Sequence, residues 1–112
     1  MDIKINYIEE VGVISIGGEL DAQTSPELTQ FFSKQIAENN WNFVADLQGL
    51  SYSSSAGIRI FLGMARESRS HGGDLRIAAV QPQVHKIFKL SKFDRIVKIF
   101  PTVDEAIQSF SS

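Results

Sequence analysis

The sequence contains no cysteine, and this absence excludes disulfide bonds, thiolate nucleophiles and zinc–thiolate sites. No apolar run approaches the roughly 18 residues that a membrane-spanning helix requires. The formal net charge is only −2, which gives no electrostatic reason to expect nucleic acid or an anionic membrane as a partner. Residues Met1–Ile5 lack the basic-then-apolar pattern of a signal peptide, so the expected location is the cytoplasm.

The overall amino-acid composition is ordinary for a globular protein. Of 112 residues, 43% are hydrophobic and 21% are charged. This length is sufficient to bury a core without metals or disulfides, and no linker or internal repeat divides it. We therefore expect a single domain over residues 1–112.

Hydrophobic periodicity predicts strands that alternate with single helices. Ile3, Ile5 and Tyr7 alternate with polar residues, as in a half-buried strand, and Glu9–Gly12 predicts a turn into a second, antiparallel strand. The later alternation is typical of βαβ units with a mainly parallel sheet. Strands are expected at 3–7, 13–16, 43–47, 75–80 and 96–100. One helix is expected to begin near Thr24–Pro26 and end before Asn39, a second to begin within the serine run and end at His71, a third to open at Pro82, and a fourth to follow Thr102. The predicted fold class is α/β: a mainly parallel sheet of four to five strands, an N-terminal antiparallel hairpin and about four helices.

Capping signals mark the starts of two of these helices. Thr24 with Glu27 fits a capping box, whereas Ser25 followed by Pro26 fits a cap with proline at the first helical position. These two registers differ by one residue, and the sequence does not choose between them. Thr102 with Glu105 forms a second capping box.

A run of three serines lies between the central apolar strand and the clearest helix. Ser53, Ser54 and Ser55 stand where a helix N-terminus needs side-chain oxygens for its unpaired N–H groups, so one of them is expected to cap the helix. The helix dipole and these N–H groups also favour a negative charge there. The segment is therefore both a structural turn and a candidate regulatory site.

Four segments together carry a family resemblance. They are Gly18–Asp21, Asp46–Ile58, the Gly72–Gly73 pair before a strand, and Phe93–Phe100. In this order they resemble the STAS domain, and more closely the small stand-alone anti-sigma-factor antagonists of bacteria. The resemblance extends from about Ile3 to Phe110, which is nearly the whole chain.

The resemblance implies a partner-switching regulator. In that family a protein that is both serine kinase and anti-sigma factor phosphorylates a serine at the start of this helix, and a phosphatase, here expected to be of the PP2C type, removes the phosphate. Aligned through Gly57, the family motif makes Ser55 the acceptor, with Ser54 as a minor alternative. The chain departs from the motif at two positions, because Ser54 replaces an aspartate and Ala56 replaces a hydroxyl residue.

The partner surface implied by the resemblance surrounds this serine. Asp21 follows a predicted strand, and ligand sites in parallel sheets gather at the carboxyl ends of strands. An alternative role for Asp21 is to stabilise its own loop through side-chain-to-backbone hydrogen bonds. The predicted partner-binding residues are Asp21, Ser53, Ser54, Ala56, Gly57 and Ile58.

Other readings of the sequence have weaker support. Gly49–Ser53 lacks the second glycine of a nucleophile elbow, and Gly57 and Gly63 lack the Lys-Ser/Thr ending of a phosphate-binding loop. No catalytic residue, cofactor, metal site or nucleic-acid partner is predicted, and no membrane insertion is expected. Two alternatives stay open: an unphosphorylated STAS scaffold or transporter-associated module, and a small-molecule or nucleotide-binding domain. A basic stretch is either a contact for an acidic surface or an ordinary solvated face, and it comprises Lys86, Lys89, Lys92 and Arg95.

Overall fold

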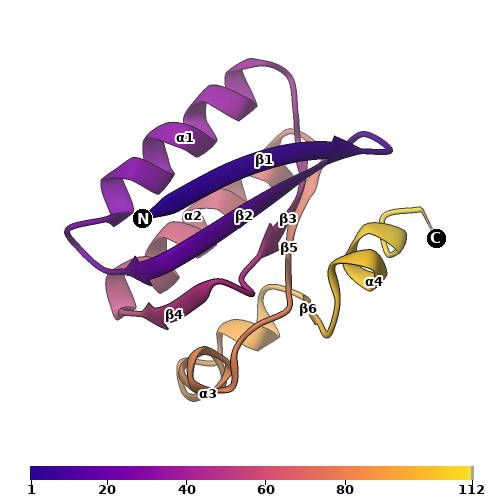
Figure 1. Cartoon of the computed structure of the whole chain (residues 1–112). Coiled ribbons are helices and arrows are strands. Elements are labelled where there is room, and N and C mark those ends of the chain that lie inside the picture. The colour runs from indigo at the N-terminus through magenta and orange to yellow at the C-terminus, as the bar shows by residue number, and fades with distance from the viewer. Residues whose placement is uncertain (112) are drawn as a thin grey trace.

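The computed structural model describes residues 1–111 as a six-stranded sheet with helices on both faces (Figure 1). The α/β class, the N-terminal antiparallel pair and the four helices agree with the prediction. In chain order the elements are β1 (Asp2–Ile8), β2 (Val11–Leu20), α1 (Ser25–Ala37), β3 (Asn42–Asp46), β4 (Leu50–Ser53), α2 (Ser55–Ser70), β5 (Asp74–Ala78), α3 (Pro82–Leu90), the 3₁₀ helix η1 (Phe93–Arg95), β6 (Ile99–Phe100) and α4 (Val103–Gln108).

One strand was not predicted from the sequence. The main order of the sheet is β1-β2-β3-β5-β6, and β4 pairs in parallel with the second half of β2. The first half of β2 pairs with β3, from Gly12 opposite Phe43 to Ser15 opposite Asp46. After a turn at 47–49, the chain continues as β4, which lies beside β2 and runs parallel to it. Strand β2 is therefore longer than predicted, and it ends next to the serine turn.

A glycine allows β2 to change partners. Gly18 has a φ of 101°, a conformation that side chains with a Cβ rarely adopt, and the register with β4 shifts between Gly18 and Glu19. The N–H of Gly18 donates to the carbonyl of Gly49 at 2.9 Å, which connects β2 to the turn between β3 and β4. This irregularity directs the end of β2 toward β4.

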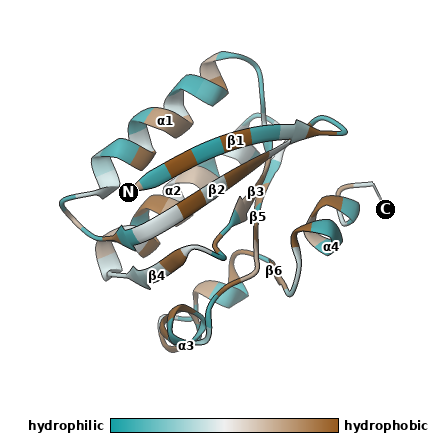
Figure 2. Cartoon of the chain, viewed as in Figure 1, coloured by the Kyte–Doolittle hydropathy of each residue, from teal (hydrophilic) through white to brown (hydrophobic). Residues whose placement is uncertain are grey.

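Two apolar cores lie on opposite faces of the sheet. The larger core joins the inner faces of α1, α2 and α3 to the sheet, and at its centre the rings of Phe61, Phe88 and Phe93 contact one another. The smaller core lies under α4 and contains Val44, Ala106 and Ile107 among its buried residues. Figure 2 shows the alternation of apolar and polar residues along β1, whose apolar side chains pack on the larger core.

The start of α1 follows the first of the two predicted registers in position, with Thr24 as the N-cap, but it lacks the capping hydrogen bond. Thr24 is the residue that precedes α1, and Pro26 lies in its first turn, but the Thr24 hydroxyl donates to the Glu19 carbonyl instead of capping the helix. At α4 the Thr102 hydroxyl accepts from the Glu105 N–H at 3.1 Å, as the capping box predicts.

The last predicted strand is mostly replaced by other structure. Of the predicted strand at 96–100, only Ile99–Phe100 pairs in the sheet. The residues before them form a turn after η1, in which Val97 is 1% exposed and packs in the larger core. Over residues 1–111, the helices are all too short or too polar to cross a bilayer.

Candidate functional site

The serine turn lies beside the loop that contains Asp21. Leu20 and Ser53 are paired in register at the ends of the parallel strands β2 and β4, so the residues after them leave the sheet at the same edge. The N–H of Ser54 donates to the Leu20 carbonyl at 2.8 Å and joins the two chain segments directly. The predicted gathering of these residues at the carboxyl ends of strands is therefore present.

Ser54 and Ser55 have different environments. Ser54 is the N-cap of α2, and its hydroxyl accepts from the Gly57 N–H at 3.4 Å. Ser55 is the first residue of the helix and is exposed to solvent, and within residues 1–111 its hydroxyl has no hydrogen-bond partner. Of the two candidate acceptors, Ser55 therefore presents the accessible hydroxyl, whereas Ser54 is engaged in stabilising the helix start.

Three of the predicted contact residues are buried. Ser53 is 1% exposed and Ile58 is 8% exposed, and Gly57 packs so tightly that a Cβ there would lie 2.5 Å from Ser53 Oγ and 2.8 Å from Leu20 Cγ. These residues shape the turn and do not offer surface to a partner. The half-buried Ala56 is the remaining predicted residue of the helix start.

Asp21 stabilises its own loop. Its Oδ1 accepts hydrogen bonds from the backbone N–H of Thr24 at 3.0 Å and of Gln23 at 2.9 Å. The bond from the Thr24 N–H is the main cause that lowers the pKa of Asp21, and the Gln23 N–H and Thr24 hydroxyl add to it. The loop-stabilising role, one of the two alternatives, is therefore observed, and the carboxylate remains at the site in its charged form at neutral pH.

We expect Asp21→Asn to destabilise the domain at pH 7 and to have a smaller effect in acid. The folded pKa is lowered, so the carboxylate stabilises the fold above its unfolded pKa of about 3.9, and this stabilisation is lost as the pH falls through the folded pKa. Urea unfolding of both proteins at pH 7 and at pH 2–3 measures the difference. Asp2→Asn, at the exposed start of β1, is the control for removal of a surface carboxylate. If Asp21→Asn lowered the free energy of unfolding equally at both pH values, the expectation would be contradicted.

A groove between α1 and α2 begins at this site. It comprises two hollows of about 430 and 580 Å³ that share Thr29, Arg59 and Ile60, and we call it the α1–α2 groove. Its other lining residues are Ala22, Ser25, Pro26, Gln30, Phe32, Ser33, Ile36, Ala56, Gly63, Met64 and Glu67.

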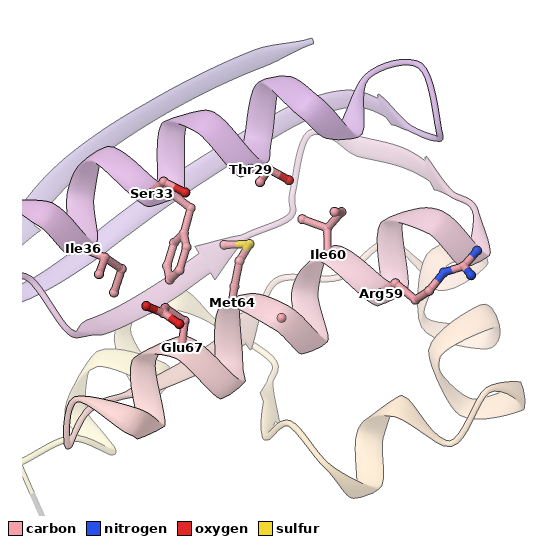
Figure 3. Close-up of a pocket in the computed structure, with 9 residues that line it drawn as sticks. Thr29, Ser33, Ile36, Arg59, Ile60, Met64 and Glu67 are labelled. Carbon is pink, nitrogen blue, oxygen red and sulfur yellow. The ribbon is translucent and has the colours of Figure 1, made fainter.

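The α1–α2 groove is mostly apolar, with Arg59 where its two hollows meet and Glu67 in the hollow farther from the serine turn. Figure 3 shows Ile60 and Met64 directed from α2 toward α1, with Arg59 near the start of the helix and Glu67 farther along it. Arg59 and Glu67 are eight residues apart on α2, or about 12 Å along the axis. Of the two charged residues, the cationic Arg59 is therefore nearer to the serine turn, where the helix dipole is also positive.

Sequence reasoning missed this groove, although one signal for it exists. Gly63 is exposed in the middle of α2, and a Cβ there would have no atom within 4 Å. Core packing therefore does not require glycine at this position, and its absent side chain opens the groove. Within residues 1–111, no three His, Asp or Glu side chains come together as a metal site.

A family model and several known proteins match nearly the whole chain. The family model described as the STAS domain matches residues 2–106. The anti-sigma F factor antagonist of Paenibacillus polymyxa is 24% identical over 112 residues, covering 99% of this chain and 93% of its own. A crystal structure of an anti-sigma factor antagonist from Mycobacterium paratuberculosis superposes with a TM-score of 0.90 at 23% identity, covering 99% of this chain and 94% of that one.

The chain is also similar in fold to two structures of SpoIIAA, one unphosphorylated and one phosphorylated. The structure of the anti-sigma factor antagonist SpoIIAA in its unphosphorylated form has a TM-score of 0.83, with 98% of this chain and 96% of that chain covered. The phosphorylated form of SpoIIAA from Bacillus has a TM-score of 0.73, with 97% and 99% covered. Both are 23% identical to this chain, so they establish its fold.

Proposed function

The chain belongs to the STAS domain family, and from this membership we propose that it is an anti-sigma-factor antagonist controlled by phosphorylation of Ser55. It binds an anti-sigma factor that is also a serine kinase, and thereby releases a sigma factor in the cytoplasm. The observation that supports this choice of residue is the hydroxyl of Ser55 at the start of α2, which is exposed and has no hydrogen-bond partner among residues 1–111. The protein itself is regulatory, and the kinase and a PP2C-type phosphatase are other proteins.

The modification transfers the terminal phosphoryl group of ATP to Ser55. A bond forms between the Ser55 Oγ and phosphorus, the bond from that phosphorus to the bridging oxygen breaks, ADP leaves, and the hydroxyl proton passes to a base of the kinase. Hydrolysis by the phosphatase restores the hydroxyl and releases inorganic phosphate. No step requires a catalytic group from this chain.

The added charge acts on the complex more than on the fold. A phosphate brings a charge of about −1.5 to −2 and three acceptor oxygens, and the N-terminus of α2 favours such a group. Against a closely packed partner the same group would have to lose water, which is unfavourable. Ser55 thus permits release of the partner while the domain stays folded.

The docking surface that we propose combines the serine turn with the α1–α2 groove. Asp21, Ser54 and Ala56 offer exposed or half-buried atoms around Ser55, and the groove continues this surface past Arg59. Ser53, Gly57 and Ile58 contribute by holding the turn in place from beneath.

We expect Ser55→Asp to weaken binding of the cognate anti-sigma factor about a hundredfold, which corresponds to roughly 3 kcal/mol. Serine kinases of the anti-sigma-factor class from the same host are purified, incubated with this protein and ATP, and the phosphopeptide is mapped by mass spectrometry. Titration calorimetry then measures the affinity of the kinase that phosphorylates the chain for wild type and variants.

Ser55→Ala is the matched control, because it removes the acceptor oxygen without adding charge and should keep the affinity within a few-fold. Ser54→Asp tests the neighbouring position. Phosphate on Ser54 alone would move the switch by one residue. Unchanged affinity of Ser55→Asp, with the wild type demonstrably phosphorylated at Ser55, would show that charge does not release the partner. Complete absence of phosphate with tight binding would instead favour a constitutive STAS scaffold.

A further inference from the structure

The basic residues of this chain are concentrated at one corner of the molecule. Residues 82–101 contain five of the eleven lysines and arginines but only one of the thirteen aspartates and glutamates. The segment therefore has a net charge of +4, and the rest of the chain has −6. These five basic side chains are all exposed, and within residues 1–111 none forms an ion pair: Lys86, Lys89, Lys92, Arg95 and Lys98.

The backbone brings η1 back against α3, and so brings the segments that carry these residues together. Lys92 has a left-handed conformation, with φ of 62°, and reverses the chain between α3 and η1. The contact of Phe88 with Phe93, at a centroid distance of 4.6 Å, holds η1 against α3. In Figure 1, α3 lies at the bottom of the molecule and the turn between β1 and β2 at the upper right.

Two aliphatic side chains protrude among the lysines. Leu90 is 76% exposed and Ile96 is 53% exposed, and within residues 1–111 they are the two most exposed large hydrophobic residues. The ribbon of α3 in Figure 2 accordingly carries both hydrophilic and hydrophobic colours. We call these two residues and the five basic ones the α3–η1 surface.

Helix electrostatics explains only part of this arrangement. A lysine in the last turn of a helix, such as Lys89, interacts favourably with the negative end of the dipole. Arg95 and Lys98 lie beyond α3, and no dipole argument accounts for the exposure of Leu90. The α3–η1 surface therefore requires another explanation.

We propose that the α3–η1 surface binds the anionic face of a lipid bilayer, with Leu90 and Ile96 entering the headgroup region. A cluster of four to eight basic residues on an amphipathic element is typical of attraction to anionic lipid, and each residue strengthens binding about fivefold. Protruding aliphatic side chains surrounded by lysines suit the boundary between headgroups and acyl chains. The attachment is peripheral and does not depend on the proposed sigma-factor function.

The residue types of the α3–η1 surface favour a bilayer over an acidic protein as its binding partner. Protein interfaces are enriched in arginine and aromatic side chains and depleted in lysine. Here lysine outnumbers arginine four to one, and Phe88 and Phe93 are buried. The net charge of −2 does not oppose the contact, because screening limits interactions between exposed charges to about 10 Å at 0.1 M salt, less than the 22–30 Å dimensions of the molecule.

The test is sedimentation of the full chain with sucrose-loaded vesicles at 0.1 M salt. Vesicles of 70% phosphatidylcholine and 30% phosphatidylglycerol should bind at least tenfold more tightly than pure phosphatidylcholine vesicles, and 0.5 M salt should abolish the difference. The triple variant Lys89→Gln, Lys92→Gln, Lys98→Gln should bind about a hundredfold more weakly, and Leu90→Ser severalfold more weakly.

A matched triple variant distinguishes an effect of the α3–η1 surface from an effect of the net charge of the protein. Lys4→Gln, Lys34→Gln, Arg66→Gln alters the net charge by the same amount at exposed sites elsewhere, and it should bind the anionic vesicles within a few-fold of wild type. Absent or lipid-independent binding by the wild type, or equal losses in both triple variants, would overturn the proposal. Binding to soluble polyglutamate but not to anionic vesicles would overturn it in favour of an acidic protein partner.

Discussion

Gly73→Ala is expected to lower the free energy of unfolding by about 3 kcal/mol or more. An added Cβ would lie 1.9 Å from the carbonyl oxygen of Trp41 and 2.4 Å from its carbonyl carbon. Both are backbone atoms, and that oxygen also accepts from the Asp74 N–H at 3.1 Å, so neither side can move without breaking the start of β5. A domain of this size is stable by only about 5–15 kcal/mol.

Gly63→Ala is the natural control, because the same change at this exposed helical position meets no atom within 4 Å. Removing a glycine from the interior of a helix should stabilise the domain by about 0.5–1 kcal/mol. Urea unfolding followed by circular dichroism measures both variants. If the two glycines responded alike, the close approach of Gly73 to Trp41 would not be the cause of the loss.

Phe61→Ala is expected to destabilise the domain by about 3–5 kcal/mol. Phe61 is fully buried, and its ring centroid lies 6.1 Å from those of both Phe88 and Phe93. Truncation would leave a cavity where α2, α3 and η1 meet. The change would also loosen the support of α2, the helix that begins at Ser55.

Phe61→Leu keeps most of the volume and should lose less than about 1.5 kcal/mol. Both variants are measured by urea denaturation, and an unchanged slope would show that the change lies in stability and not in the denatured state. A loss of under 1.5 kcal/mol for Phe61→Ala would mean that the three rings repack to close the cavity.

Much of the fold was predictable because its signals are local. Alternation along β1, the capping pair of Thr102 and Glu105, and the glycine that follows α2 each act within a few residues, and the structure has all three. Strand β4 was missed because Leu50–Ser53 is short and becomes a strand only by pairing with β2, more than thirty residues earlier. The shortened β6 also depends on tertiary packing, since Val97 of the predicted strand lies outside the sheet and is buried in the larger core.

The candidate site was likewise predictable only in part. The parallel strands allowed the nearness of Asp21 and the serines to be predicted, because carboxyl ends of such strands share an edge. Which serine caps the helix and which stays exposed depends on one residue of register, and Ser53 and Ile58 are buried by packing that no local pattern encodes. The α1–α2 groove depends on how two helices pack, and only the exposed Gly63 hinted at it.

The unequal size of the two cores implies that the free energy of local unfolding differs between parts of the chain. The face under α4 is closed by a six-residue helix and a two-residue strand over few buried side chains, whereas α1, α2 and α3 share the larger core. Amide hydrogens of α4 and β6 should therefore exchange with solvent through local opening, while those of β2, β3 and α2 await global unfolding. Fluctuations at the C-terminal end should thus be decoupled from the surface around Ser55, which is supported by the larger core.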